Sequence, residues 1–495
     1  MHEPLFLAID EGTSGTKVVI FGIDGRIHAK ATGNLSSIYP RPLFVEQDGE
    51  AILQDVLSTC TIAIKNLASS GASSGAIVAI GISNQRETFL LWDESGVPLG
   101  NAIVWQCKRS VDVCEDLKRS GLERELRIST GLLADPYFSG SKVIWLHRND
   151  PVVRSVIDSG KAHFGTVDTW LLYRLSKGAY KTDYTNASRT LFFNLRELRW
   201  DRGLLERFDL GKLVLPEACP SSHPFGETDL YGLLPGRVPI TSMIGDSHAA
   251  AVGQGLFYPG STKATLGTGS SILMNVGSAP TESRSGMVST ICFSAGTRVD
   301  YALEGIIVSC GSPLKWLHDA LGLYSGYQEA EAMARSVPDS FGVSLIPAFA
   351  GMGAPYWRMD SKGTLTGLTF GTRKEHIIRA AFEAMAFQIV DIVAAMEGDG
   401  KVSLQELIVD GGMTENAFAM QLIADVLGRP VANLGISEAS ALGAARLAAL
   451  QWGAVASLED FHREGPQPRR FFPGIGRNAA VAVYDSWKSA VERVL

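Results

Sequence analysis

The sequence predicts an α/β protein built from two similar halves, and three observations lead to this prediction. Apolar, strand-like runs are interspersed with amphipathic, helix-like stretches along the chain. A strand–turn–strand pattern with glycine and hydroxyl residues in the turn occurs near the start and again near residue 268. The chain has 495 residues, too many for one ordinary core, and this length favours roughly two to four domains.

Composition narrows the class of protein. Hydrophobic residues make up 45% of the chain and charged residues 20%, as is usual for globular proteins. The net charge of -7 argues against a protein that binds nucleic acid electrostatically. The six cysteines are scattered without metal-ligand spacing, no stretch is apolar for long enough to cross a bilayer, and the first residues do not resemble a signal peptide. We therefore expect a cytoplasmic enzyme with reduced thiols and no membrane insertion.

The first strand–turn–strand pattern lies at the start of the chain. Residues 5–9 are a continuous apolar run, residues 10–16 form a turn, and residues 17–21 form a second strand. Because no helix follows the glycines, a Rossmann or Walker phosphate loop is disfavoured. Backbone N–H groups of the turn could bind phosphate oxygens, with Asp10 placed to hold Mg²⁺ through water. The alternative is an ordinary Gly/Thr hairpin, which the turn considered alone favours.

A similar pattern opens the second half of the chain. Residues 262–266 are strand-like, residues 267–270 form a glycine–hydroxyl turn, and residues 271–276 form a second strand. The repetition predicts a duplicated architecture with a phosphate bound between the halves.

The stretch at residues 244–250 lies near the middle of the chain and carries the candidate catalytic residue. An apolar strand ends here in Gly245 and Asp246, and a small-residue, helix-compatible run follows. Ligand-binding groups of α/β proteins lie at the carboxyl ends of strands, so we hypothesise that Asp246 is the catalytic base of a phosphotransferase. The alternative is that Asp246 is only a helix N-cap, and this stretch alone favours neither.

Arg86 and Glu87 follow the strand expected at residues 77–82. At a strand end they could bind hydroxyl groups, because the guanidinium donates and the carboxylate accepts. The alternative is a surface ion pair, which is the more frequent situation.

Other elements are predicted from periodicity and turn residues. Helices are expected at residues 47–67, through residues 142–145, at residues 376–396, and from Thr414, as N-cap, to residue 427; short strands are expected at residues 102–105 and 407–409. Residues 201–239 are expected to be an irregular excursion. Gly411 and Gly412 would let a ligand approach the backbone beside the positive end of the last helix.

The motifs together carry a family resemblance. They are residues 10–13, 81–88, 104–107, 135–139, 164–170, 182–191, 267–269, 302–305, 347–357 and 410–412, with two family signatures at residues 137–149 and 363–383. In this order they resemble the FGGY carbohydrate kinases over nearly the whole chain, and most closely the branch that phosphorylates glycerol. The resemblance implies an α/β fold of two actin/hexokinase-like (ribonuclease H-like) domains, each a mixed five-stranded sheet flanked by helices, with an interdomain active-site cleft. It implies an N-terminal domain at residues 1–252 (polyol and Mg²⁺/phosphate side) and a C-terminal domain at residues 253–495 (nucleotide side).

The resemblance also implies roles for individual residues. Asp246 would accept the proton of the attacking hydroxyl, and Asp10 and Asp246 would serve the Mg²⁺ site. The residues implied to bind the polyol are Arg86, Glu87, Trp105, Tyr137, Asp246, Ser247 and Ser271. The residues implied to bind ATP are Thr13, Ser14, Lys17, Thr268, Gly311, Lys315, Gly412 and Asn416. Members of the family often form dimers or tetramers, so a homodimer or homotetramer is an open expectation.

Several positions depart from the pattern of the glycerol-phosphorylating branch. That branch carries glutamine at the position of Ser247 and phenylalanine at the position of Ser271, so the pocket here is expected to be larger and more polar. Lys17 replaces arginine and Lys315 replaces glutamine, and both keep a hydrogen-bond donor for ATP. Residues 233–237 lack the glycine pattern of the loop that binds the inhibitor fructose 1,6-bisphosphate, so such inhibition is not predicted.

The sequence therefore predicts an ATP-dependent kinase that transfers the γ-phosphate to a terminal hydroxyl of a small polyol. Glycerol, giving glycerol 3-phosphate, is the leading substrate, and the alternative is a longer polyol or ketose such as erythritol or a pentulose. A more distant alternative is an ATP-binding switch like actin or heat-shock 70 proteins, which would have no use for Arg86, Glu87 and Tyr137 beside Asp246. A dehydrogenase is disfavoured because no strand–GxGxxG–helix unit is present.

Overall fold

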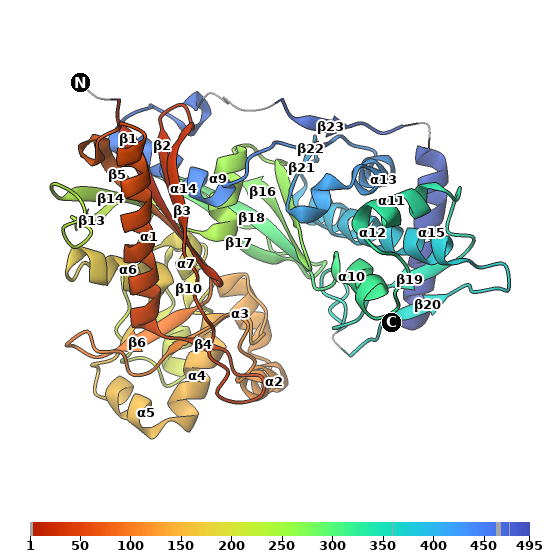
Figure 1. Ribbon diagram of the computed structural model, residues 1–495. Coiled ribbons are helices and arrows are strands. Elements are labelled where there is room, and N and C mark those ends of the chain that lie inside the picture. The colour runs from red at the N-terminus through yellow and green to blue at the C-terminus, as the bar shows by residue number, and fades with distance from the viewer. Residues whose placement is uncertain (1–2, 359, 462–466, 475) are drawn as a thin grey trace.

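A large mixed β-sheet runs through the whole molecule (Figure 1). The computed structural model describes residues 3–358, 360–461, 467–474 and 476–495. The strands of this sheet are, in spatial order, β23 (Arg469–Phe471), β22 (Val431–Asn433), β21 (Leu407–Asp410), β15 (Thr262–Leu266), β16 (Ser270–Gly277), β18 (Arg298–Ile307), β17 (Val288–Ala295), β13 (Ser222–Thr228), β14 (Val238–Gly245), β5 (Ile77–Asn84), β1 (Leu5–Gly12), β2 (Gly15–Gly22) and β3 (Ile27–Thr32).

The same five-strand arrangement occurs once in each half of the chain. In the first half the order is β3-β2-β1-β5-β14, with β1, β2 and β3 antiparallel and β1, β5 and β14 parallel. In the second half the order is β18-β16-β15-β21-β22, with β15, β16 and β18 antiparallel and β15, β21 and β22 parallel. This repetition confirms the predicted duplication, and both glycine turns connect the first two strands of a repeat.

The strands of the two repeats form one continuous sheet and not two separate five-stranded sheets. An extra strand in each half, β13 and β17, lies between them, and these two strands pair through Ser222 and Ala295 alone. The expectation of five strands for each sheet is therefore too small, because each half adds at least one strand at the junction.

Helices cover the sheet, and the described residues also form four smaller, separate sheets. The helices are α1 (Gly49–Ser69), α2 (Val111–Arg119), α3 (Glu123–Thr130), α4 (Ser139–Asn149), α5 (Pro151–Asp158), α6 (Val167–Ser176), α7 (Tyr184–Ala187), α8 (Arg202–Arg207), α9 (Asp246–Gln254), α10 (Ser312–Asp319), α11 (Tyr327–Arg335), α12 (Lys374–Gly400), α13 (Ala417–Leu427), α14 (Ala439–Trp452) and α15 (Arg477–Val494), with 3-10 turns η1 (Ser74–Ala76), η2 (Gly412–Glu415) and η3 (Leu458–Asp460). The smaller sheets are β4 (Glu46–Gln47), β7 (Ala102–Ile103), β6 (Phe89–Trp92) and β8 (His163–Thr166); β9 (Lys181–Asp183) with β12 (Glu217–Cys219); β10 (Phe193–Asn194) with β11 (Arg199–Trp200); and β19 (Ser344–Ile346) with β20 (Thr364–Thr366).

Helices α9 and α14 pack against each other where the two halves meet (Figure 1). Their backbones approach so closely that a Cβ atom on Gly443 would lie 1.8 Å from the carbonyl oxygen of Ala249. Glycine is therefore required at this crossing. Helix α14 follows β22 of the second half yet packs on β1, β5 and β14 of the first, so the chain crosses back between the halves. One hydrophobic cluster joins residues of both repeats, including Ala8 of β1 and Leu273 of β16.

Most predicted elements are confirmed, and two expectations are wrong. Thr414 does not cap the helix that follows it: Asn416 is the N-cap of α13, and its side chain accepts a hydrogen bond from the N–H of Ala419. The intervening residues form η2, which displaces Gly412 from the helix start by one short turn. The segment 201–239 is not an irregular excursion, because it contains α8, β12 and the sheet strand β13.

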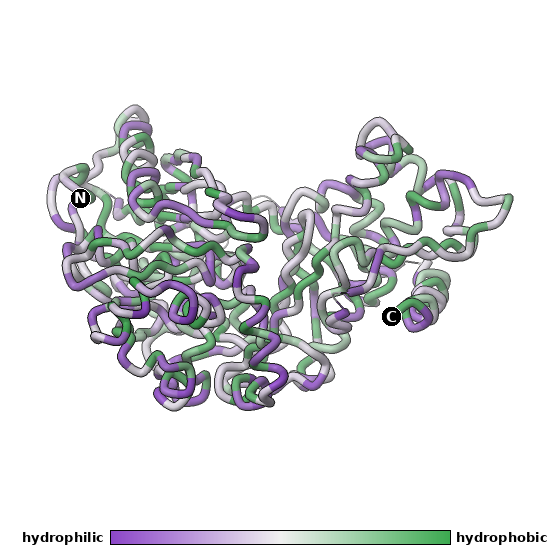
Figure 2. Tube along the Cα trace, turned by 90° about the horizontal axis from the view of Figure 1, so that it is seen from below, coloured by the Kyte–Doolittle hydropathy of each residue, from purple (hydrophilic) through white to green (hydrophobic). Residues whose placement is uncertain are grey.

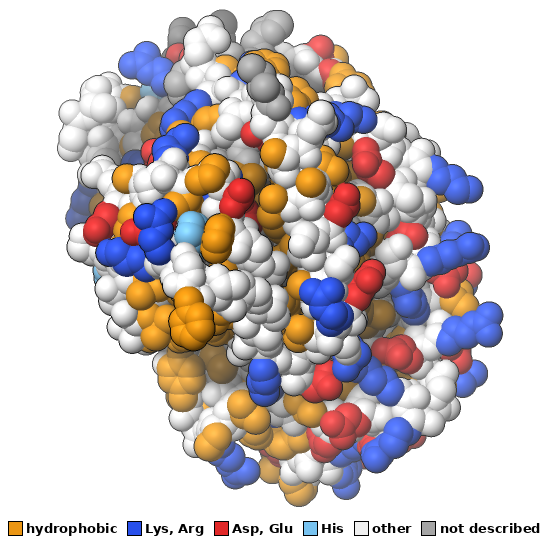
Figure 3. Space-filling model, turned by 90° about the vertical axis from the view of Figure 1, so that its right-hand side faces the viewer, with side chains coloured by type: hydrophobic (Ala, Val, Ile, Leu, Met, Phe, Trp, Pro, Cys, Tyr) orange, Lys and Arg blue, Asp and Glu red, His pale blue; other side chains and the backbone are white. Residues whose placement is uncertain are grey.

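The distribution of side chains is that of a globular protein. Hydrophobic segments follow the central strands, and hydrophilic segments lie mostly outside them (Figure 2). On the face in Figure 3, acidic and basic side chains are interspersed. All six cysteines are buried free thiols. Among the described residues no helix combines the length and apolar character needed to span a bilayer.

Candidate active site

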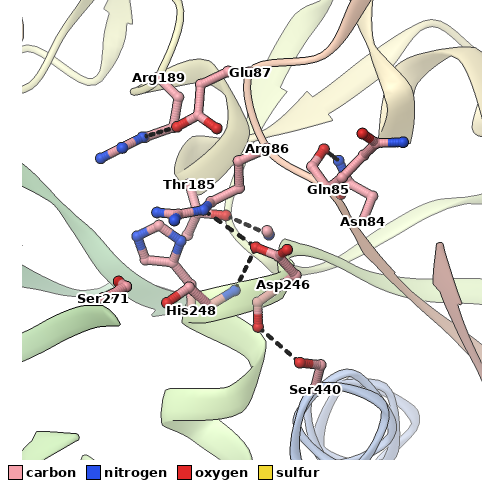
Figure 4. A network of polar contacts seen from close by, with 12 residues as sticks. Asn84, Gln85, Arg86, Glu87, Thr185, Arg189, Asp246, His248, Ser271 and Ser440 are labelled. Atoms are coloured by element: carbon pink, nitrogen blue, oxygen red, sulfur yellow. Dashed lines mark hydrogen bonds and ion pairs between the residues drawn. The ribbon is translucent and has the colours of Figure 1, made fainter. Parts of the chain in front are cut away.

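Asp246 lies where strand β14 ends and helix α9 begins, near the junction of the two halves (Figure 4). Gly245 occupies the N-cap position and Asp246 is the first helical residue, so the simple N-cap alternative is wrong. The carboxylate accepts a hydrogen bond from the N–H of Ser247 at 2.6 Å, and the Asp246 side chain is 42% exposed. The Asp246 carboxylate is therefore held by a backbone hydrogen bond and is still accessible to a ligand.

Arg86 is in direct contact with Asp246. Its Nε lies 3.2 Å from Asp246 Oδ1, and its Nη2 lies 2.9 Å from Glu304 Oε1 on strand β18 of the other half. The Arg86 side chain is 6% exposed, so the surface ion-pair alternative is wrong. A Cβ atom on Gly245 would lie 2.6 Å from Arg86 Cγ, which explains the glycine before the aspartate.

Glu87, Arg189 and Glu304 complete a buried group of charges with Arg86. Arg189 Nε lies 2.5 Å from Glu87 Oε1, and Arg189 Nη1 lies 2.7 Å from Glu304 Oε2. Burial alone would raise the pKa of the Glu304 carboxyl, but Arg189 and Arg86 outweigh it and hold that pKa well below its ordinary value. Two guanidinium groups and two carboxylates thus balance one another inside the protein, as buried charges must.

Sequence reasoning gave no role to Arg189 or Glu304, although both lie in motifs that it identified. The only local signal was a charged residue next to an apolar run in each motif. Glu87 adopts a left-handed backbone with φ 63°, a conformation that costs about 1 kcal/mol for a residue other than glycine. The ion pair with Arg189 helps to hold Glu87 in this conformation.

Two aromatic residues of the predicted polyol site lie side by side. The rings of Trp105 and Tyr137 meet edge to face with centroids 5.4 Å apart. The turn that carries Tyr137 is held by buried Lys142, whose Nζ donates to the carbonyl oxygens of Pro136 and Tyr137, both at 2.8 Å. Burial lowers the pKa of Lys142 to about 7, although Glu87 acts in the opposite direction.

The residues of the predicted polyol site contact the first glycine turn. Trp105 Nε1 donates to Thr13 Oγ1 at 2.9 Å, and Thr13 Oγ1 donates to Gln85 Oε1 at 3.2 Å. The side chain of Gln47 donates to the carbonyl oxygen of Thr13 at 2.7 Å. The Thr13 hydroxyl proton is thus held by Gln85, and the exposed turn at Ser14 is left to offer backbone N–H groups and a hydroxyl.

Asp10, near the end of strand β1, lies close enough to Asp246 for the two charges to interact. It pairs in register with Lys17 on β2 and Ser83 on β5, and Ser83 Oγ donates to Asp10 Oδ1 at 2.8 Å. Burial raises the pKa of Asp10 to about 6, with the Ser83 hydrogen bond opposing and the Asp246 charge adding to the rise.

This donor set fits a divalent cation. Two neighbouring carboxylates that repel each other are stabilised by Mg²⁺, which prefers oxygen ligands and keeps several waters. Within the described part of the chain, no group of three or more His, Cys, Asp or Glu side chains could hold a metal ion. Asp10 and Asp246 would therefore share such an ion with water and with a ligand's own oxygens.

Ser247 directly follows Asp246 in the chain, and Ser271 contacts the buried charges at Glu304. Ser271 Oγ donates to Glu304 Oε1 at 2.9 Å, while Ser247 Oγ is buried without a hydrogen-bond partner among the described residues. Next to Ser247, the ring of His248 is fully buried below Arg86 (Figure 4). Burial, with Arg86 adding to it, lowers the pKa of His248 well below its ordinary value, so the imidazole is neutral.

Three of the predicted nucleotide residues lie together at the second glycine turn. The N–H of Gly311 donates to the carbonyl oxygen of Gly267 at 2.9 Å, and the N–H of Ser312 donates to that of Thr268 at 3.2 Å. A Cβ atom on Gly311 would lie 3.3 Å from the side chain of Met413, the neighbour of Gly412. Thr268, Gly311 and Gly412 are thus brought together at one end of the second repeat.

Three predicted nucleotide residues are engaged elsewhere. Lys315 is exposed on α10 and pairs with Asp319 one turn later. Asn416 is used as the N-cap of α13. Lys17 Nζ lies 3.2 Å from Glu438 Oε2, a residue that sequence reasoning did not single out. A role for these three residues toward ATP remains a prediction.

Comparisons with known proteins agree with the duplicated architecture. The family models for the N-terminal and C-terminal domains of the FGGY family of carbohydrate kinases match residues 5–253 and 262–452. The chain is 43% identical to a glycerol kinase of Symbiobacterium thermophilum, over 100% of this chain and 99% of that protein. It is also 43% identical to glycerol kinase 1 of Thermotoga maritima, over 99% of each. The crystal structure of Plasmodium falciparum glycerol kinase with ADP superposes with a TM-score of 0.93 at 34% identity, covering 100% of this chain and 98% of that one.

Proposed function

Because the chain belongs to the FGGY family of carbohydrate kinases, we infer that it is an ATP-dependent polyol kinase with glycerol as its acceptor. The products would be glycerol 3-phosphate and ADP. Support comes from relatives named glycerol kinase that match nearly end to end, and from the Plasmodium glycerol kinase, whose crystal structure was determined with ADP. The observation that carries the proposal is the contact between Arg86 and Asp246, which puts a hydroxyl-binding group next to a candidate base.

Arg86 and Glu87 bind the glycerol hydroxyls in this proposal. The guanidinium donates and the carboxylate accepts, so together they match the two faces of a hydroxyl group. Trp105 and Tyr137 pack against the carbon chain, and Ser247 and Ser271 border it. Arg189 and Glu304 act through Arg86 and Glu87, whose side chains they hold in place.

Asp246 then acts as the general base. Its carboxylate orients the terminal hydroxyl and accepts the proton late, as the oxygen forms a bond to the γ-phosphorus and the bond from phosphorus to the β-phosphate oxygen breaks. A primary alcohol is not ionised beforehand at neutral pH, so orientation is the first contribution of Asp246. The carboxylate's exposure permits this direct contact.

ATP is the proposed phosphoryl donor and Mg²⁺ the proposed cofactor. Thr13, Ser14 and Lys17 would face the phosphates from the domain at residues 1–252, and Thr268 would face them from the domain at residues 253–495. Gly311, Lys315, Gly412 and Asn416 would lie along the nucleotide. Asp10 and Asp246 would hold the Mg²⁺, which would supply charge neutralisation at the phosphates.

Two alternatives remain distinct from this proposal. An ATP-binding switch would need Asp10 and the glycine turns but not the buried charges around Arg86. A kinase for a longer polyol or ketose would keep all the chemistry and differ only at Ser247 and Ser271. The cytoplasm is the proposed location, and a homodimer or homotetramer is the proposed assembly, which sedimentation equilibrium would test.

The product of the reaction tests the proposal. The purified protein is incubated with Mg²⁺, ATP and glycerol, and ³¹P NMR follows the phosphorus signals. Equal amounts of ADP and glycerol 3-phosphate are expected, with little ADP when glycerol is omitted. Glycerol-independent ADP release without a phosphate ester would instead support the switch.

A further inference from the structure

Glu438 binds two lysines at once. Its Oε2 lies 3.2 Å from Lys17 Nζ, and its Oε1 lies 3.3 Å from Lys30 Nζ. The Glu438 side chain is only 12% exposed, whereas those of Lys17 and Lys30 are 45% and 55% exposed. The carboxylate is thus the mostly buried partner, whereas the lysines face the solvent on long, flexible side chains.

The two lysines are neighbours on one face of the sheet. Lys17 on β2 pairs in register with Thr32, and Lys30 pairs with Val19 two residues along. Because side chains alternate along a strand, Lys17 and Lys30 point to the same face and would repel each other. Glu438 offsets this repulsion by binding both.

Glu438 is held rigidly relative to the catalytic residue. It immediately precedes helix α14, in which Ser440 Oγ donates to the carbonyl oxygen of Asp246 at 3.0 Å (Figure 4). The first residue of α14 also packs on α9, since a Cβ atom on Gly253 would lie 2.1 Å from the carbonyl oxygen of Ala439. If Glu438 exchanges one ion-pair partner for another, the lysines must therefore be the groups that move.

We propose that Glu438 and Lys30 are positioning residues that control the availability of Lys17 to the phosphates of ATP. Without nucleotide, Lys17 rests on Glu438; with nucleotide, Lys17 moves to a phosphate oxygen, and Lys30 keeps Glu438 paired. The inference rests on the proposed function, in which Lys17 faces the phosphates. Lys30 is essential to the exchange, because a mostly buried carboxylate left alone is unfavourable.

If Lys17 moves between Glu438 and ATP, substitutions of Glu438 and of Lys30 should change the affinity for ATP in opposite directions. Glu438→Gln releases Lys17, so ATP should bind more tightly, by about two- to fivefold. Lys30→Met leaves Lys17 as the sole partner of Glu438, so ATP should bind more weakly, by about two- to fivefold. Lys30→Arg keeps a cation and should restore the wild-type affinity.

The test is a calorimetric titration with Mg²⁺ and adenylyl imidodiphosphate, an ATP analogue that is not turned over. Each variant is measured alone and combined with Lys17→Met. If the exchange operates, Glu438→Gln and Lys30→Met change the dissociation constant in opposite directions, and both effects disappear with Lys17→Met. Lys161→Met, which removes an exposed lysine paired with Glu94 elsewhere, is the control and should change nothing.

Three results would overturn the proposal. Effects that persist with Lys17→Met would mean that the charges act through space on the nucleotide. Losses of affinity in both single variants would mean that the group is only structural, and unchanged affinity in both would mean that Lys17 does not leave Glu438. The glycerol kinase assay on the wild-type protein is independent of these results, so a failure here leaves the proposed function standing, and a wild type inactive on glycerol would be recognised separately.

Discussion

Arg86 Nε lies 3.2 Å from Asp246 Oδ1, so the residue assigned to bind the acceptor touches the residue assigned to take its proton. The same guanidinium reaches Glu304 on the other repeat at 2.9 Å. A hydroxyl held by Arg86 would therefore lie within reach of Asp246 without further rearrangement of the first repeat.

Asp246→Asn should abolish phosphoryl transfer while leaving nucleotide binding nearly intact. The amide keeps the size of the side chain but cannot accept the hydroxyl proton, so kcat should fall by about 100- to 10,000-fold. Rapid-quench assays with glycerol and a separate titration with ADP measure the two quantities. Nucleotide affinity should stay within about threefold of wild type; a loss of affinity as large as the loss of rate would argue against the assigned role.

Glu304→Gln should destabilise the protein and weaken glycerol binding together. The substitution removes the buried carboxylate that both guanidinium groups share and leaves Arg86 with Asp246 and Arg189 with Glu87. This loss should cost about 3 kcal/mol of unfolding free energy. Urea unfolding and the KM for glycerol are the measurements. Glu459→Gln is the matched control, because Glu459 pairs with Arg298 at 2.7 Å near the surface and should cost less than about 1 kcal/mol. Equal losses in the two variants would contradict the buried role of Glu304.

Ser271→Phe should lower the KM for glycerol and exclude longer acceptors. Ser271 donates to Glu304 and is proposed to border the polyol, so a phenyl ring there would add an apolar wall and reduce the space for a fourth carbon. A decrease in KM of about three- to tenfold is expected. Ser271→Ala removes only the hydroxyl and separates the loss of this hydrogen bond from the gain of the wall. An unchanged KM in Ser271→Phe would mean that residue 271 does not border the acceptor.

Lys142→Met should change the free energy of unfolding by an amount that depends on pH. Burial lowers the folded-state pKa of Lys142 to about 7, while the unfolded chain keeps an ordinary lysine. Below pH 7 Lys142 is charged in the folded protein, and its burial lowers the free energy of unfolding by the full amount. This destabilisation decreases as the pH rises from 7 toward the ordinary lysine pKa. Wild-type stability relative to Lys142→Met should therefore be greater at pH 9 than at pH 6, by about 2 kcal/mol.

Urea unfolding at the two pH values checks this expectation. Lys118→Met, which removes an exposed lysine on α2, is the control and should show no such pH dependence. The same stability difference between wild type and Lys142→Met at both pH values would show that Lys142 is charged in the folded protein.

Local sequence patterns predicted the repeats well. The apolar run of β1 is continuous because the strand is buried in the sheet, and β1 and the strand-like β15 are each followed by a glycine turn. Arg86, Glu87 and Asp246 could also be identified, because each follows a strand where side chains must reach a ligand.

The remaining features depend on contacts that local patterns do not encode. Arg189 binds Glu87 across 102 residues of sequence, and Glu438 binds Lys17 across 421. The packing of α14 against the first repeat likewise depends on tertiary contacts, including the close helix crossing at Gly443. The wrong N-cap at Thr414 arose because Thr and Asn both suit that position, and only the backbone after Gly411 decides between them.

Phosphorylation of glycerol is tested most directly by the catalytic efficiency of the wild-type protein with Mg²⁺ and ATP across a set of acceptors. The set comprises glycerol, erythritol, the pentitols and the common pentuloses, and ADP release is measured for each. The highest kcat/KM is expected for glycerol, with Ser247 and Ser271 as tolerated variations. A longer polyol or a ketose preferred by about tenfold or more would contradict glycerol as the acceptor, and no acceptor-dependent ADP release at all would contradict the kinase.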